Sequence, residues 1–160
     1  MSNNSTPRGE YLIVTAQFNV LVTERLAVGA REALLHAGIA PADIDEERVA
    51  GAWELPLVVA VAARSGRYRA VVACGAVIRG ETPHFDHVSR TAIDGLARVQ
   101  LDTRIPVGLA VLTTNTLEQA LDRAGGKGGN KGSEAALAVL QSVEAIARHG
   151  ADVEDGPLRV

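Results

Sequence analysis

Short apolar runs alternate along this chain with longer stretches in which apolar residues recur at helical spacing. The runs Tyr11–Ala16 and Ala70–Ile78 are continuous, apolar and rich in β-branched residues, which predicts buried strands. A third run at 107–113 and a weaker one near 48–51, with a start as early as Asp45, predict two further strands. The pattern therefore predicts four strands.

The stretches between these runs predict five helices. In the first, residues 24–37, Leu26, Ala30 and Leu34 share one face, and Gly38 stands at the stop position. The others are expected at 55–63, 83–101, 116–124 and 133–148. The second helix is apolar almost throughout, which predicts that it is buried.

Strands that alternate with helices pair in parallel through right-handed crossovers. Strands that are apolar on both faces need helices on each side of the sheet. The expected fold is α/β: a flavodoxin-like three-layer α/β/α sandwich around a four-stranded parallel sheet. We expect one domain at 11–149, a flexible N-terminal arm at 1–10 and a C-terminal tail at 150–160.

Composition narrows the functional classes. A net charge of −3 gives no basic footprint for nucleic acid, and no apolar run approaches the length of a membrane span. The first ten residues lack the features of a signal peptide. Cys74 is the single cysteine, so no disulfide can form within the chain, and mid-strand it reads as a small buried hydrophobe. A globular cytoplasmic protein is expected.

Sites in open parallel sheets form beyond the carboxyl ends of the strands. Four segments should therefore share one edge: Phe18-Asn19, 51–54, 79–84 and Thr114-Asn115. No His, Cys and carboxylate cluster has the spacing of metal ligands, so no metal site is expected.

The third segment carries the most chemistry. Thr82 suits an N-cap, Pro83 suits the first helical position, and Gly80 allows a tight loop before them. Such a helix start can hold a phosphate on its free N–H groups, and His84 beside it can transfer protons near neutral pH. The alternative is a plain capped helix with a solvated histidine.

Three other positions allow two readings each. Glu54 either complements a helix dipole or accepts hydrogen bonds from ligand hydroxyls. Phe18 is either a core residue, the better interpretation of it alone, or a platform for a flat ring. The glycine-rich segment 125–132 lacks the Gly-Lys-Ser/Thr ending of a P-loop and follows a helix. It predicts a flexible connection, where Arg123 and Lys131 either meet an anion or stay solvated.

Taken together, four motifs in order resemble the lumazine synthase family over residues 11–148. They are GAWELP at 51–56, GAVIRGETPHFD at 75–86, VLTTNTLEQA at 111–120, and RAG with NKG within 123–132. The resemblance implies condensation of 5-amino-6-(D-ribitylamino)uracil with 3,4-dihydroxy-2-butanone 4-phosphate. Phosphate and water leave, in the penultimate step of riboflavin biosynthesis. It also implies that no metal and no organic cofactor take part.

The resemblance assigns a role to each site residue. The pyrimidine stacks on Phe18, and its edge meets the backbone of Ala76, Val77 and Ile78. Ala52, Trp53 and Glu54 line the ribityl chain. Phosphate binds backbone N–H groups of Glu81 and Thr82 together with Arg123, and His84 transfers protons. The residues expected from a neighbouring subunit are Leu109, Arg123 and Lys131.

Two positions depart from the family pattern, and the tail from Gly150 to Val160 has no counterpart in it. Leu109 stands where some members carry Phe, and Glu81 places a carboxylate beside the phosphate loop, so we expect it to point away. The family forms pentamers, and many members pack twelve of them into a shell. The short connection between Arg123 and Lys131 favours that 60-subunit shell. Riboflavin synthase is a further expected partner.

Two other functional classes compete with the enzyme. One is a binding or shell-forming protein that keeps the fold without the chemistry, and the intact polar side chains of the implied site argue against it. The other is a flavodoxin-like mononucleotide binder. It would need a phosphate loop after the first strand, where residues 16–19 contain neither glycine nor serine.

Overall fold

The computed structural model describes residues 9–150. The main sheet is parallel and has its strands in the order β2-β1-β3-β4. The strands are β1 (Tyr11–Ala16), β2 (Ile44–Val49), β3 (Ala70–Ile78) and β4 (Val107–Thr114). The helices are α1 (Val20–His36), α2 (Leu55–Arg64), α3 (His84–Thr103), α4 (Leu117–Asp122) and α5 (Lys131–Arg148). Two 3-10 turns, η1 (Pro41–Asp43) and η2 (Ala52–Glu54), and a hairpin of β5 (Ala124–Gly126) and β6 (Gly129–Asn130) complete the fold.

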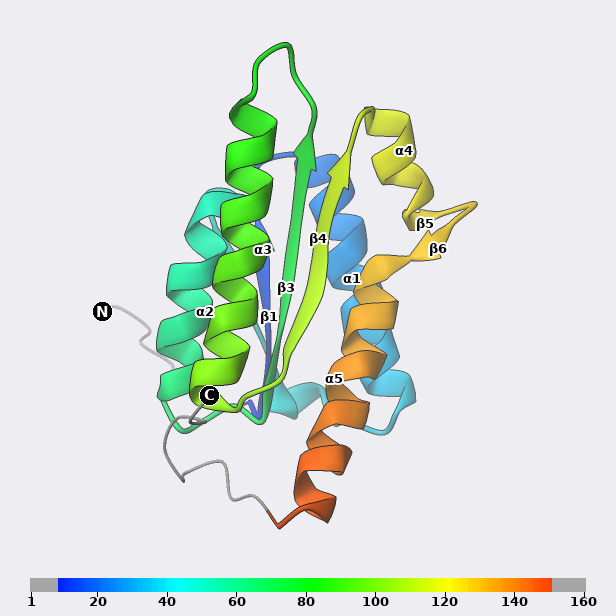
Figure 1. Cartoon of the computed structure of the whole chain (residues 1–160). Helices are drawn as coiled ribbons and strands as arrows, with labels where there is room; N and C mark the ends of the chain where they lie inside the picture. Colours follow the sequence, from blue (N-terminus) through cyan, green and yellow to red (C-terminus); the bar gives the residue numbers. More distant parts are fainter. Residues whose placement is uncertain (1–8, 151–160) are drawn as a thin grey trace, which may run out of the picture.

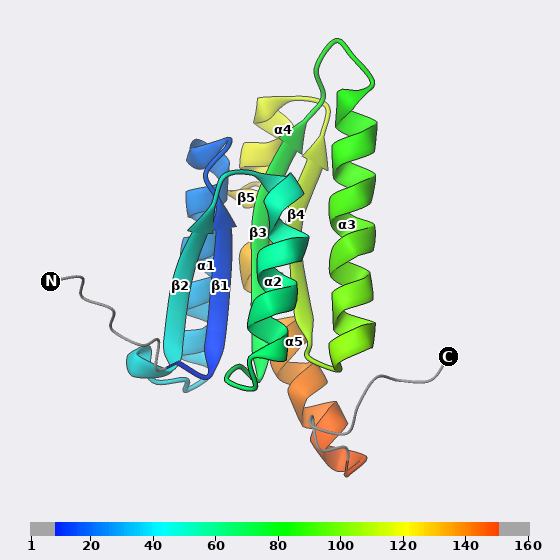
Figure 2. The same cartoon turned by 90° about the vertical axis from the view of Figure 1, so that its left-hand side faces the viewer.

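Helices cover both faces of the sheet, which confirms the three-layer sandwich. Figures 1 and 2 show α1 and α5 on one face and α2 and α3 on the other. Each face has its own apolar cluster, because alternate side chains of a strand point to opposite sides. In β1, for example, Ile13 packs with the α1 side and Val14 with the α2 side. Burial on both faces explains why β1 and β3 match the sequence prediction to the residue.

Two helices differ clearly from their predictions, whereas α3, α4 and α5 differ by one or two residues at their ends. α1 begins at Val20, four residues before the expected start at 24, because Asn19 adopts a left-handed conformation with φ 61° and turns the chain directly after β1. α2 is not buried on all sides. Leu57 and Val61 are 70% and 66% exposed, so only one stripe of this apolar helix reaches the core.

The expected flexible connection after α4 is instead the β5–β6 hairpin, which leads directly into α5. Cys74 is fully buried, as predicted from its place in the strand. Within residues 9–150, no helix combines the length and the apolarity that crossing a membrane requires. Most of the predicted N-terminal arm (1–10) and C-terminal tail (150–160) lies outside the described residues.

Candidate active site

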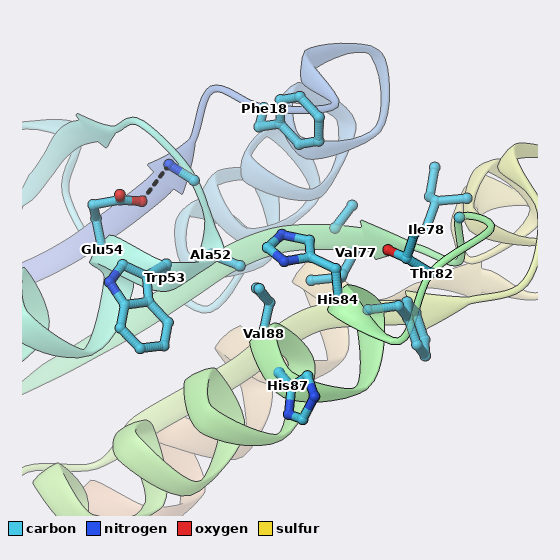
Figure 3. Close-up of a pocket in the computed structure, with 14 residues that line it drawn as sticks. Phe18, Ala52, Trp53, Glu54, Val77, Ile78, Thr82, His84, His87 and Val88 are labelled. Atoms are coloured by element: carbon cyan, nitrogen blue, oxygen red, sulfur yellow. Dashed lines mark hydrogen bonds between the residues drawn. The ribbon is translucent and has the colours of Figure 1, made fainter.

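A cavity of about 750 Å³ opens at the carboxyl ends of β1 and β3. It is walled by the end of β1, the turn before α2, the end of β3 and the start of α3, which include three of the four predicted edge segments. The fourth, Thr114-Asn115 at the end of β4, does not line the cavity, contrary to the prediction. Figure 3 shows these walls meeting around His84, with Phe18 above the ring and Val88 below it in this view. The predicted site residues that line it are Phe18, Ala52, Trp53, Glu54, Ala76, Val77, Ile78, Thr82 and His84.

The cavity exists because β3 is longer than its neighbour β1. Their pairing ends at Thr15 and Cys74, and β3 continues to Ile78 with only β4 beside it. Successive residues of a strand direct their backbone groups to opposite sides. Arg79 donates its N–H to Thr114 on β4 (2.8 Å), so Val77 also faces β4, whereas Ala76 and Ile78 face the open side. The backbone of β3 thus forms one polar edge of the cavity.

Asn19 supports this edge, although no sequence pattern assigns it a role. Its Nδ2 donates to the Ala76 carbonyl at 2.9 Å. Asparagine is among the few non-glycine residues that tolerate the left-handed conformation found here, a signal that could have marked it. The turn leaves the neighbouring Phe18 ring 72% exposed, so the interpretation of Phe18 as a core residue is wrong.

Glu54 stands in a defined orientation at the opposite wall. Its Oε2 accepts a hydrogen bond from the Gly51 N–H at 2.9 Å, drawn as the dashed line in Figure 3. The residue belongs to η2, directly before α2 begins at Leu55. The carboxylate is half-buried, and this one bond leaves lone pairs free for a ligand.

The segment from Arg79 to Pro83 forms the outer rim and projects beyond the strand ends (Figures 1 and 2). Thr82 does not cap α3, contrary to the prediction: Pro83 occupies the N-cap, no side chain caps the helix, and His84 is its first residue. Among residues 9–150, none accepts a hydrogen bond from the N–H groups of Gly80, Glu81 or Thr82. A loop with open donors at a helix start suits an anion.

Arg79 anchors this loop at its first residue, a role that the sequence did not reveal. Its Nε donates to Asn115 Oδ1 at 2.9 Å, and its NH2 lies 3.4 Å from Asp86 Oδ1. The guanidinium also covers the Phe85 ring, 4.4 Å from the centroid. One side chain thus connects the ends of β3 and β4 with the first turn of α3.

The remaining predicted site residues do not line this cavity. Glu81 is exposed on the rim loop. Leu109 and Lys131 border a different hollow of about 400 Å³ between β4 and α5. Arg123 is exposed after α4, where its NH1 donates to the Gln119 carbonyl at 2.9 Å. A single copy of the chain therefore does not unite these cations with His84. No three His, Cys, Asp or Glu side chains within 9–150 gather in a way that could hold a metal ion.

Comparison with known proteins adds an independent finding. A family model described as 6,7-dimethyl-8-ribityllumazine synthase matches residues 9–147. A 6,7-dimethyl-8-ribityllumazine synthase of Anaeromyxobacter sp. (strain Fw109-5) is 51% identical over 134 residues, which cover 84% of this chain and 82% of that protein. One of Nitratidesulfovibrio vulgaris (strain DSM 19637 / Miyazaki F) is 47% identical over 137 residues, covering 86% and 88%. The family model spans the four segments that wall the cavity.

Proposed function

The chain belongs to the 6,7-dimethyl-8-ribityllumazine synthase family, and we propose that its reaction takes place in the cavity at the ends of β1 and β3. The enzyme is a transferase of riboflavin biosynthesis. It condenses 5-amino-6-(D-ribitylamino)uracil with 3,4-dihydroxy-2-butanone 4-phosphate and releases phosphate and water. One observation carries the proposed location: an aromatic platform, a fixed carboxylate, an open strand edge and a histidine converge there from four segments.

The pyrimidine substrate fits the inner part of the cavity. Its ring stacks on the exposed Phe18, and its polar edge meets the backbone of Ala76 and Ile78 on the side of β3 away from β4, with Val77 completing the wall. The ribityl chain then extends past Ala52 and Trp53 toward Glu54. Because one Glu54 oxygen is held by Gly51, the other is directed without further ordering cost toward the ribityl hydroxyls.

The phosphate of the second substrate fits the rim. The open N–H groups of Glu81 and Thr82 and the positive end of α3 supply donors and partial charge. Arg123 of a neighbouring copy supplies a full positive charge, and Leu109 and Lys131 of that copy close the cavity from outside. Glu81 directs its carboxylate to solvent, since an inward orientation would repel the phosphate.

The need for a neighbouring copy extends the proposal to assembly. The enzyme works as a cytoplasmic homopentamer, twelve of which pack into a 60-subunit shell, with riboflavin synthase as a further partner. The short hairpin between Arg123 and Lys131 supports the shell over a free pentamer. Light scattering of the purified protein decides between them, and a monomer that retains full activity would contradict the shared site.

His84 moves protons while the bound substrates do most of the chemistry themselves. The amine attacks the ketone to form an imine with loss of water, phosphate is eliminated, the ring closes and a second water leaves. Holding both reactants together supplies about 7–11 kcal/mol in favourable cases, whereas general acid–base catalysis contributes about 10²–10⁴-fold. His84 stands at the first position of α3, beside the proposed phosphate and over the end of β3.

Product fluorescence after mixing both substrates tests this function directly. His84→Ala should lower kcat by about 10²-fold or more and still form product, because proximity remains. His36→Ala, at the far end of α1, is the matched histidine control and should behave as the unchanged enzyme. If His84→Ala folded but had no activity at all, the proposal that proximity contributes more to catalysis than proton transfer would be wrong. If the unchanged protein formed no product, the protein would instead be a non-catalytic binding or shell-forming protein.

A further inference from the structure

The two cations that lie outside the cavity are joined to each other. Arg123 follows α4 and Lys131 begins α5, and the β5–β6 hairpin lies between them. The Lys131 N–H donates to the Arg123 carbonyl at 2.9 Å, and the Gly128 N–H donates to the Asp122 carbonyl at 2.8 Å. The hairpin base therefore holds the backbones of Arg123 and Lys131 at a set separation. What orients this base relative to the sheet decides where both cations point.

Asn130 connects the hairpin base to two helices at once. Its Oδ1 accepts from the N–H groups of Gly132 (2.8 Å) and Ser133 (3.2 Å), which caps α5. Its Nδ2 donates to the Arg25 carbonyl of α1 at 3.0 Å, across 105 residues of sequence. Within residues 9–150, no other side-chain hydrogen bond joins residues 123–131 to α1.

Two glycines leave room for this amide. A Cβ at Gly29 of α1 would overlap with the Asn130 side chain, and a Cβ at Gly132 would overlap with the Leu26 carbonyl oxygen. Glycine at these positions lets the hairpin base and the start of α5 approach the α1 backbone closely. The Ser133 hydroxyl adds a second bond across this contact, to the Gly29 carbonyl at 3.0 Å.

We propose that Asn130 is a positioning residue for the reaction: by fastening the hairpin base to α1, it aims Arg123 and Lys131 at the neighbouring copy's cavity. The inference rests on the proposed role of Arg123 at the phosphate and of Lys131 in closing the cavity. Asn130 itself touches no substrate. Its amide does two separate tasks, since Oδ1 caps α5 whereas Nδ2 sets the direction of the hairpin.

Steady-state kinetics with both substrates separate positioning from stability. Asn130→Ala should raise the KM for the butanone phosphate by about tenfold or more, while the KM for the pyrimidine stays within about twofold. Asn130→Asp keeps the capping oxygen and loses the donor to Arg25, so it should raise the same KM even if Asn130→Ala does not fold. Ser133→Ala is the matched control. It removes the other side-chain bond between α1 and α5, and should lower Tm without changing either KM.

The double variant Asn130→Asp/Arg123→Ala shows whether Asn130 acts through Arg123. Its KM for the phosphate substrate should equal that of Arg123→Ala within about twofold, because a lost cation cannot also be misdirected. Suppose that Arg123→Ala strongly raises the KM for the phosphate substrate, whereas Asn130→Asp has the same KM as Ser133→Ala. This result would overturn the inference about Asn130 and leave the proposed role of Arg123 intact. An unchanged KM of Arg123→Ala would instead reject the proposed role of that cation.

Discussion

Two segments supply the proposed phosphate contacts, and they are built in opposite ways. The rim loop, residues 79–83, is held by Arg79 at its first residue, and its following N–H groups are open. The hairpin segment, residues 123–132, is bonded to itself and to α1, with glycines where the backbones approach. A Cβ at Gly80 would meet nothing within 4 Å, whereas one at Gly132 would meet backbone.

From the sequence alone, the opposite is expected: a flexible hairpin segment and an ordered rim loop. Five glycines within 125–132 favour a flexible connection, and Thr82-Pro83 favours a capped helix start. In the structure Gly126, Gly128 and Gly132 permit close contact with backbone, whereas Gly125 and Gly129 adopt positive φ. The helix start is uncapped. Glycine thus marks close contact as readily as freedom, and neighbouring elements decide which applies. The unpaired N–H donors of the rim loop suit a phosphate group that binds and dissociates. The fixed hairpin suits the positive charge of Arg123, which must reach the cavity of another copy.

The largest expected effect is the difference in stability between the alanine variants of Gly132 and Gly80. Gly132→Ala should lower the free energy of unfolding by about 3 kcal/mol or more, because its Cβ overlaps with the Leu26 carbonyl of another helix. Gly80→Ala is the matched substitution and should change stability by less than about 0.5 kcal/mol. Urea unfolding of both variants measures the difference. Equal stabilities would refute the close contact at α5.

Cys74 offers an independent readout of the same variants. Burial in the centre of β3 raises the pKa of its thiol to about 12, so Cys74 should resist thiol reagents while the protein is folded. Gly132→Ala should speed its modification, and Gly80→Ala should not.

The next effect concerns affinity. Arg123→Ala should raise the KM for the butanone phosphate about 100-fold, equal to about 2.7 kcal/mol, and leave Tm nearly unchanged because the side chain is exposed. Steady-state kinetics and thermal unfolding check the two parts. A similar rise for Lys127→Ala, which removes a cation at the exposed hairpin tip, would indicate a general field in place of a specific contact.

A smaller effect is expected at the anchor of the rim loop. Arg79→Met keeps an apolar stem over Phe85 and loses the bonds to Asn115 and Asp86. The loosened loop should lower kcat/KM for the phosphate substrate about tenfold. Asp86→Asn, which weakens one of the two bonds, should cost less. An unaffected Arg79→Met would show that the loop needs no anchor.

The smallest effect tests the carboxylate on the rim. Glu81→Ala should leave the KM for the butanone phosphate within about threefold, because the exposed side chain does not line the cavity. A loss of about 100-fold or more in kcat/KM would mean that Glu81 takes part in binding or chemistry.

Local sequence pattern was enough for the layers of the fold and for much of the cavity. β1 and β3 are apolar on both faces because both faces are covered, and that condition is written in consecutive residues. The strand-end rule then placed Phe18, Glu54 and His84 at one edge without knowledge of any contact.

Contacts between distant residues decided the rest. Asn19 holds Ala76, Arg79 holds Asn115, and Asn130 holds Arg25, and none of these pairs has a periodic signature. They set the early start of α1, the exposure of Phe18, the rim loop and the hairpin. Sequence alone therefore determined three of the segments that meet at the cavity, because burial repeats along the chain. Only the tertiary structure decided how they are held, because single polar side chains bond to whatever backbone the fold brings beside them.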